Sequence, residues 1–368
     1  MNNAIITPSS LENMRTAVIC DNLMWKGGGG RATLVLARAF NADIWTTTYL
    51  PEKTYPDFEL FKVYDNPLRC LKFNWHLGPL DLILRGLIQT ESIFRFQRME
   101  FSDYDLVITI GQYSKHVPIH YQNHRMHYEL YVKTSYQLEW LFKAWVWYMK
   151  KIDCEVTQKI PTLVCNSENT KNKIQKIYNR DAEVVYPAVN INMFRTGNSE
   201  DYFLAVERIV PEKGIETQLE AFRIVPERKL LIVGSPNEKD IPYFRKLVRI
   251  APRNVTFVGL ITNDELVKLY AHSKAVIQTH PDEALGRVPI EAMASGKPCI
   301  AVNAGGFKET LVNGKTGVLV DPPYSQNIAE AIRNFNRLDY NPDDCQERAK
   351  LFSEEIHIKK MRKIVANL

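Results

Sequence analysis

The sequence has no apolar run approaching the ~18 residues that a membrane-spanning helix needs, so no transmembrane helix is expected. Its six cysteines include no C-x-x-C pair, which argues against a zinc site and a redox motif and fits a reducing, cytoplasmic compartment. Residues 1–13 are polar and lack the apolar segment of a signal peptide, so we expect a flexible tail there. The net charge of +5 is too small to predict a nucleic-acid-binding face, but it is compatible with an acidic ligand and an anionic membrane surface.

Two common phosphate-binding motifs are also absent. Neither G-x-G-x-x-G nor a Gly-Lys-Ser/Thr P-loop occurs near the run of four glycines at positions 27–30. This run nevertheless follows an apolar segment, residues 16–20, and precedes a helical pattern at 32–40. A strand, a glycine loop and a helix in that order are typical of a loop that approaches phosphate, although a flexible turn would have the same composition.

Short apolar segments alternate with helical patterns along the chain, most regularly in its second half. The predicted strands there are residues 203–206, 230–233, 255–258, 276–279, 299–302 and 318–320. Strands separated by helices form βαβ units, so we expect an α/β protein with parallel sheets. The polar, irregular residues 190–201 place a domain boundary near 188–200, between domains of 14–188 and 200–345 and a C-terminal helix at 346–368.

Charged residues and glycines follow three of the predicted strands. Arg208 and Lys213 follow the first strand of the second half, Glu283 follows the fourth, and Gly305 and Gly306 follow the fifth. The carboxyl ends of parallel strands meet at one edge of a sheet, where ligands of such folds bind. The sequence therefore predicts that these residues converge on one site.

The segment after the fourth strand contains two glutamates eight positions apart, Glu283 and Glu291. Pro289 fits the first turn of a helix and Gly296 can end it, so we predict a helix over residues 288–295 with Glu291 in its first turn. The free N–H groups of that turn would suit a diphosphate.

Residues 283–301, EALGRVPIEAMASGKPCIA, resemble the paired-glutamate signature of the family 4 retaining glycosyltransferases. Residues 207–214, ERIVPEKG, resemble the G-R-x-x-x-x-K-G segment of the same family, with Glu207 at the glycine position. The resemblance implies that Glu283 contacts the hydroxyls of a donor sugar, Glu291 the ribose, and Arg208 and Lys213 the diphosphate.

The fold that this resemblance implies is GT-B: two Rossmann-like domains facing a central cleft, with parallel sheets and a C-terminal helix that crosses back to the N-terminal domain. Residues 14–188 would bind the acceptor and residues 200–345 the nucleotide sugar. The residues expected to bind that donor are Gly28, Gly29, Ile261, Leu285, Gly286, Arg287, Glu291, Gly305 and Gly306.

The chain departs from the family pattern at several positions. Gly30 stands where an acidic residue is common, and Asn123 where a histidine is common, so we assign His124 or His127 to the active site instead. Arg287 replaces an apolar residue and would either tune donor choice or point to solvent.

No metal site is expected. The histidines at 116, 120, 124 and 127 have helical spacing, but Pro118 interrupts the helix and no cysteine or carboxylate completes the set. No Asp-x-Asp follows a predicted strand. Arg208, Lys213 and helix dipoles would neutralise the diphosphate without a cofactor.

The activity that follows from these expectations is transfer of a hexose, mannose from GDP-mannose above all, to a glycan or lipid-linked acceptor. Retention would arise by same-face attack. The alternatives are a UDP-sugar-dependent transferase, a nucleotide-sugar epimerase or phosphorylase of the same fold, and a non-catalytic scaffold. Residues 140–151, with three tryptophans beside lysines, form either a core helix or a patch at the inner face of a membrane.

Overall fold

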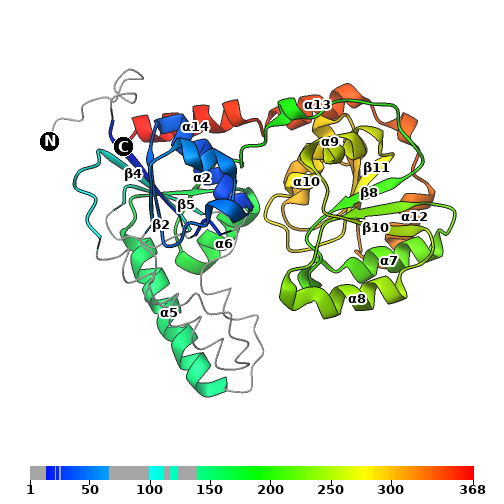
Figure 1. Ribbon diagram of the computed structural model, residues 1–368, viewed down its shortest axis with the longest axis horizontal. Coiled ribbons are helices and arrows are strands. Elements are labelled where there is room, and N and C mark those ends of the chain that lie inside the picture. The colour runs from blue at the N-terminus through cyan, green and yellow to red at the C-terminus, as the bar shows by residue number, and fades with distance from the viewer. Residues whose placement is uncertain (1–13, 21, 25, 66–98, 112–116, 123–138) are drawn as a thin grey trace. The chain divides into compact units, whose positions relative to one another are not determined.

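The computed structural model describes residues 14–20, 22–24, 26–65, 99–111, 117–122 and 139–368 (Figure 1). These residues form two compact units. Unit 1 comprises residues up to Pro187 together with His357–Leu368, and unit 2 comprises Ala188–Ile356. Each unit contains one sheet, and every strand pairing in the described residues is parallel. The predicted α/β fold of two Rossmann-like domains with parallel sheets is confirmed.

The sheet of unit 1 has the strand order β3-β2-β1-β4-β5-β6-β7. Its strands are β1 (Thr16–Cys20), β2 (Asp43–Thr46), β3 (Val63–Asp65), β4 (Leu106–Ile110), β5 (Ile119–Gln122), β6 (Thr162–Cys165) and β7 (Glu183–Val184). The described helices of the unit are α2 (Gly28–Phe40), α5 (Glu139–Lys159), α6 (Glu168–Tyr178) and, from His357 on, α14 (Glu354–Ala366). All residues of β1 and β4 are buried, because helices cover both faces of a parallel sheet.

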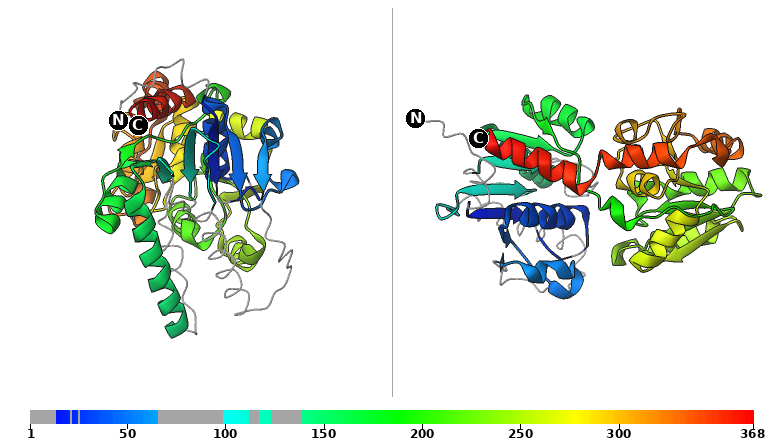
Figure 2. Two further views of the ribbon diagram at one scale, coloured as in Figure 1. Left: turned by 90° about the vertical axis from the view of Figure 1, so that its left-hand side faces the viewer. Right: turned by 90° about the horizontal axis from the view of Figure 1, so that it is seen from above.

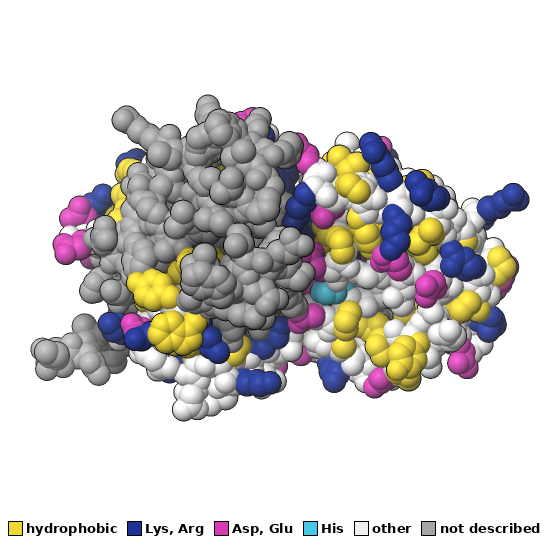
Figure 3. Space-filling view, turned by 90° about the horizontal axis from the view of Figure 1, so that it is seen from below, with side chains coloured by type: hydrophobic (Ala, Val, Ile, Leu, Met, Phe, Trp, Pro, Cys, Tyr) yellow, Lys and Arg dark blue, Asp and Glu magenta, His cyan; other side chains and the backbone are white. Residues whose placement is uncertain are grey.

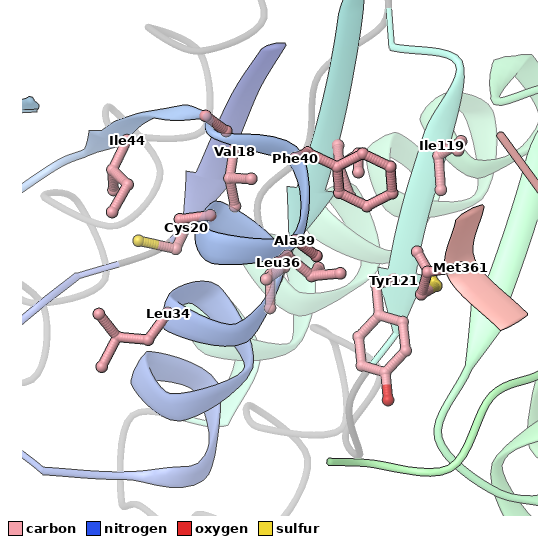
Figure 4. Close-up of a cluster of buried hydrophobic side chains, with 14 of the residues drawn as sticks. Val18, Cys20, Leu34, Leu36, Ala39, Phe40, Ile44, Ile119, Tyr121 and Met361 are labelled. Carbon is pink, nitrogen blue, oxygen red and sulfur yellow. The ribbon is translucent and has the colours of Figure 1, made fainter. Parts of the chain in front are cut away.

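One core of unit 1 joins elements from both ends of the chain (Figure 4). Val18 and Tyr121 from the sheet and Leu36 from α2 are buried in one cluster with Met361 from α14. The Arg362 guanidinium also donates to the carbonyl of Ala39 over 2.9 Å. Figure 2 shows the C-terminal helix beside α2. Burial of its apolar face thus holds α14 on unit 1.

The sheet of unit 2 has the order β10-β9-β8-β11-β12-β13. Its strands are β8 (Phe203–Val206), β9 (Leu230–Val233), β10 (Val255–Gly259), β11 (Ala275–Gln278), β12 (Cys299–Val302) and β13 (Gly317–Val320). The helices are α7 (Ile215–Ile224), α8 (Ile241–Ile250), α9 (Asn263–His272), α10 (Arg287–Ala294), α11 (Phe307–Thr310), α12 (Ser325–Arg333) and α13 (Pro342–Lys350). The chain builds the sheet outwards from β8 in both directions, so the topological switch point lies between β8 and β11.

Two helices begin or end differently from the sequence-based expectation. Helix α2 begins at Gly28, so Gly28 and Gly29 lie in its first turn and not in a free loop before it. The C-terminal helical stretch is broken at residues 351–353, where the N–H of Val189 donates to the carbonyl of Phe352 over 2.9 Å. This hydrogen bond replaces one that a continuous helix would make within itself, and it separates α13 from α14.

The surface of unit 2 has no extended apolar belt on the face shown in Figure 3, where hydrophobic side chains are interspersed with lysine, arginine and acidic side chains. None of the described helices combines the length and the hydrophobicity that crossing a bilayer requires.

Candidate functional site

The switch point of unit 2 brings together an acid and a base that are distant in sequence. The Lys213 ammonium lies 2.7 Å from Glu283 Oε2, and the two side chains are only 18% and 21% exposed. Lys213 ends the short 3₁₀ helix η4 (Pro211–Lys213), which follows β8, and Glu283 lies in the loop that follows β11. The predicted convergence of these two residues is therefore present in the structure. Partial burial shields the pair from solvent, which strengthens its electrostatic interaction.

Gly214 positions Lys213 by ending η4. Its φ of +61° lies in the left-handed region, and a Cβ at this position would meet no heavy atom within 4 Å. Glycine is thus needed here for its backbone conformation and not for space. Helix α7 starts directly after it, at Ile215.

The second glutamate, Glu291, is held by different partners. The Tyr270 hydroxyl donates to Glu291 Oε2 over 2.8 Å, and Arg287 Nη2 lies 3.7 Å from Glu291 Oε1. Burial and the neighbouring carboxylate raise the pKa of Tyr270, so its hydroxyl stays protonated and can donate. Glu291 is only 16% exposed on its side chain. Its carboxylate therefore has a fixed direction before any ligand binds.

The predicted position of Glu291 in the first turn of a helix is wrong. Helix α10 begins at Arg287, after Gly286 with φ of +88°, so Glu291 is the fifth helical residue and the first turn contains no acidic residue. The cause is the left-handed conformation of Gly286, which starts the helix one residue before the start at residue 288 that Pro289 alone predicted. Tyr270 and Arg287, and not the helix dipole, orient this carboxylate.

Three glycines support the Glu283 loop. The N–H of Gly306 donates to the carbonyl of Glu283 over 2.8 Å, and a Cβ on Gly306 would lie 2.2 Å from the carbonyl oxygen of Ala284. A Cβ on Gly305 would lie 2.6 Å from the Glu283 carbonyl, and one on Gly286 would lie 2.6 Å from the Phe307 ring. These glycines are needed for backbone packing whether or not a ligand is present. Their direct contact with a donor stays a prediction.

The remaining predicted residues of unit 2 differ in exposure. Arg208 is exposed, and its guanidinium makes no salt bridge with any residue that the structure describes. Ile261 is half-buried after β10, and Leu285 is buried beside Gly286. Arg208 is thus available to an anion, whereas Leu285 serves packing in this state.

Sequence reasoning missed a buried polar group next to Lys213. Glu207 is 8% exposed, its Oε1 accepts a hydrogen bond of 2.6 Å from Gln218 Nε2, and the same amide donates to Thr279 Oγ1 over 3.1 Å. Burial, and secondarily the Glu283 carboxylate, raise the pKa of Glu207 to about 7, against the opposing effects of Lys213 and Gln218. The available signal was the replacement of the family glycine by Glu207, directly after β8.

The other predicted residues lie outside this assembly. Gly28 and Gly29 belong to unit 1, at the N-terminus of α2, where they could present backbone N–H groups to an anion. His124 and His127 lie outside the described residues. Within the described part of the chain, no three histidine, cysteine or acidic side chains are grouped so that they could hold a metal ion.

The site of unit 2 therefore combines two oriented carboxylates with Lys213 and Arg287, and Arg208 follows the same strand as Lys213. Carboxylates accept hydrogen bonds from sugar hydroxyls, and the cations can neutralise a phosphate. An arrangement of this kind suits a ligand with both groups, such as a nucleotide sugar.

Comparison with protein families is consistent with this geometry. Residues 191–352 match the family model described as glycosyl transferases group 1. An O-antigen chain mannosyltransferase of Salmonella typhimurium is 30% identical over 207 residues, which is 55% of this chain and 57% of that protein. A D-inositol 3-phosphate glycosyltransferase of a Mycobacterium species is 27% identical over 187 residues, covering 45% of this chain and 43% of that protein. The chain thus spans about half the length of the curated relatives that it matches.

A solved structure matches over almost the whole chain. The Anabaena protein HepE, crystallised in complex with UDP, superposes with a TM-score of 0.72 over 96% of this chain and 100% of HepE, at 17% identity. At this identity the likeness supports the fold alone, and that fold is GT-B.

Proposed function

We propose that this protein, whose residues 191–352 belong to the group 1 glycosyltransferases, transfers a hexose from a nucleotide sugar to a glycan or lipid-linked acceptor. The observation that supports this proposal best is the Lys213–Glu283 pair at the switch point of unit 2. A solvent-shielded ion pair and a second oriented carboxylate provide a cation for a diphosphate and hydrogen-bond acceptors for the hydroxyls of a sugar. We infer the activity of the whole chain from this site.

Donor binding would replace the Lys213–Glu283 contact with two others. Glu283 would accept hydrogen bonds from the hydroxyls of the sugar, while Lys213 and the exposed Arg208 would move onto the diphosphate. Glu291, held by Tyr270, would accept from the ribose. As the glycosidic bond breaks, negative charge grows on the leaving phosphate, and cations aimed at it lower the barrier.

The reaction would proceed with retention of configuration. Glu283 and Glu291 both have binding roles in this proposal, so neither is free to act as a nucleophile. The acceptor hydroxyl would attack from the face that the diphosphate leaves, and the departing phosphate oxygen would take its proton. Trapping of a covalent glycosyl–protein adduct would contradict this mechanism.

GDP-mannose is the donor that we favour, with support from the mannosyltransferase named above. UDP-sugars are the alternative, and the UDP complex of HepE supports them at the level of the fold. Thermal unfolding should be measured with GDP-mannose, UDP-glucose, UDP-N-acetylglucosamine and UDP-galactose. Stabilisation by GDP-mannose alone supports GDP-mannose as the donor, and stabilisation by a UDP-sugar alone supports a UDP-sugar. If no donor stabilises the protein, the result argues against a transferase and for a non-catalytic scaffold.

Product analysis separates a transferase from the epimerase alternative. A transferase releases the nucleoside diphosphate in proportion to glycosylated acceptor. An epimerase would instead release an isomerised nucleotide sugar, and it would do so without an acceptor. A phosphorylase would require inorganic phosphate.

We propose that transfer needs no metal, because Lys213, Arg208 and Arg287 can neutralise the diphosphate. The test is activity in a chelator. Loss of activity that magnesium restores would overturn this proposal, and full activity in the chelator would support it.

Contact with an anionic membrane, at the cytoplasmic side, is a further part of the proposed function. It is supported by exposed side chains in the middle of α5, where Trp147 is 65% and Tyr148 46% exposed, and Lys151 Nζ lies 6.0 Å from the Trp147 ring centroid. Aromatic side chains beside lysines favour the headgroup region of a bilayer. Flotation with vesicles that contain phosphatidylserine should recover the protein, and substitution of both aromatic residues by serine should reduce recovery. No flotation of the unchanged protein would contradict the membrane contact.

A further inference from the structure

Glu207 is a buried acid that the proposed chemistry does not use. It directly follows β8, and its side chain is enclosed between elements that carry the site. Its Oε1 accepts from Gln218 of α7, whereas its Oε2 has no hydrogen-bond partner among the described residues. A buried carboxylate oxygen without a donor is costly, which indicates that the group either carries a proton or serves a purpose in another state.

Charged groups from several elements face this carboxyl. Lys213 from η4 attracts it, and Glu283 from the loop after β11 repels it. Tyr243 from α8 also interacts with Glu207, and its hydroxyl donates to Glu216 of α7 over 2.6 Å. The Lys213 ammonium therefore lies in the field of two carboxyl groups, of which Glu283 is its hydrogen-bond partner.

Ligand binding would change this balance. In the proposed function, Lys213 leaves Glu283 for the donor diphosphate. An ionised Glu207 would oppose that step, because it attracts the ammonium and repels the incoming phosphates. A protonated Glu207 would do neither, and its O–H could donate from the oxygen that now lacks a partner.

We propose that Glu207 is a positioning residue that controls how much of the Lys213 charge is available to the donor diphosphate, so that a sugar nucleotide binds more tightly when the Glu207 carboxyl is protonated. This inference rests on the proposed function of the site. It assigns to Glu207 the regulation of donor affinity by pH, and not a contact with the reacting atoms.

The expected pH range follows from the environment of the carboxyl. Burial raises the pKa of Glu207 from its ordinary value of 4.5 to about 7, so its protonation changes near neutral pH. Below this pKa the group is neutral and donor affinity is greatest. As pH rises through the pKa, the carboxylate forms and affinity falls.

The test is calorimetric titration of the full-length protein with intact GDP-mannose and UDP-glucose at about pH 6 and about pH 8. An intact sugar nucleotide has no terminal phosphate that titrates in this range, so its own charge stays constant. The unchanged protein should bind its donor about tenfold more weakly at the higher pH, as expected for one buried charge near the diphosphate. Glu207→Gln should bind with the tighter affinity at both pH values.

A second variant and a control separate regulation from a structural role. The Gln218 amide lowers the pKa of Glu207, so Gln218→Met should raise that pKa and move the loss of donor affinity to a higher pH. Asp240 is a control of similar burial, because it is 8% exposed and accepts a hydrogen bond from Asn237. Asp240→Asn should keep the pH dependence of the unchanged protein.

Each outcome of these titrations either supports or contradicts the role proposed for Glu207. If the unchanged protein binds its donor equally at both pH values, or if Glu207→Gln keeps the full pH dependence, the inference is wrong, and in the second case another titratable group is responsible. If no sugar nucleotide binds at either pH, the proposed function itself fails.

Stability provides a separate readout. Because the folded pKa lies above the unfolded one, the favourable contribution of Glu207 is present below about pH 4.5 and is lost as pH rises through about 7, so Glu207→Gln should raise the melting temperature more at high pH than at low pH.

Discussion

Glu283 and Glu291 lie at the same edge of one sheet, but they are held in different ways. Glu283 is on a loop, and its partner Lys213 is itself a group that we expect to bind the donor. Glu291 is on a helix, and its partner Tyr270 is fully buried. If a donor binds as we propose, the pair at Glu283 opens, whereas the pair at Glu291 stays intact. In the proposed complex, one carboxylate therefore changes its partner and the other keeps the partner that already orients it.

The largest expected effect comes from disturbing the backbone beneath the Glu283 loop. Gly306→Ala would place a Cβ 2.2 Å from the Ala284 carbonyl oxygen, so the loop must move. We expect a loss of at least about 3 kcal/mol of stability and loss of activity, measured by denaturant unfolding and donor turnover. Gly314→Ala is the control for backbone strain alone, because its φ of +76° is positive, unlike the φ of −72° at Gly306, but its Cβ would meet no atom within 4 Å, and it should cost only about 1 kcal/mol. Equal stability losses in the two variants would show that the loop does not depend on this close approach.

The second prediction removes the movable partner of Glu283. Lys213→Ala should lower kcat by about 10²–10³, by analogy with the removal of one donor that stabilises developing negative charge. Lys246, which pairs with Glu216 on the surface at 3.4 Å, is the matched lysine, and its alanine variant should leave kcat unchanged. A fall in kcat of less than about threefold in Lys213→Ala would remove this residue from the transition state.

The third prediction concerns the preorganised carboxylate. Tyr270→Phe removes only the hydroxyl that donates to Glu291, and a hydrogen bond to a charged group contributes about 1.5–3 kcal/mol. We expect donor KM to rise about tenfold with little change in kcat, because the ribose contact is the same in ground and transition states. Tyr202→Phe is the control, since that hydroxyl donates to the backbone carbonyl of Leu269 over 2.8 Å. It should change stability and leave donor KM unaltered; an equal KM change in both variants would point to general destabilisation.

The smallest expected effect is at Arg287. Its guanidinium lies 3.7 Å from Glu291 and its side chain is 26% exposed, and an ion pair of this kind contributes about 0–1 kcal/mol. Arg287→Leu should therefore raise donor KM by no more than about fivefold. An unchanged KM would assign Arg287 to solvent, and a much larger rise would show that it contacts the diphosphate directly.

Much of the fold could be predicted because apolar segments reveal buried strands. Strands β8, β9 and β12 begin and end at the predicted residues, and the alternation of strands with helical patterns indicated parallel sheets. Helix ends were harder to predict from the sequence. The start of α10 depends on the positive φ of Gly286, and the break between α13 and α14 depends on a hydrogen bond from Val189, more than 160 residues away in sequence.

The site could be predicted in part for the same reason. The rule that ligands bind at strand ends was enough to group Lys213 with Glu283. It could not identify Tyr270 as the partner of Glu291, because a phenol on α9 reaches that carboxylate only through the packing of two helices. It also could not show that Glu207 is buried, since an acid after a strand is usually solvated.

The order of apolar and charged residues, by itself, determined two parallel sheets and which strand end carries each charged group, since periodicity and chain connectivity are local properties. The packing of distant segments was needed to show that Glu283 faces Lys213, that Glu291 faces Tyr270 and that Glu207 is shielded from water. These facts depend on distances and solvent exclusion between distant segments, and electrostatic energies change steeply with both.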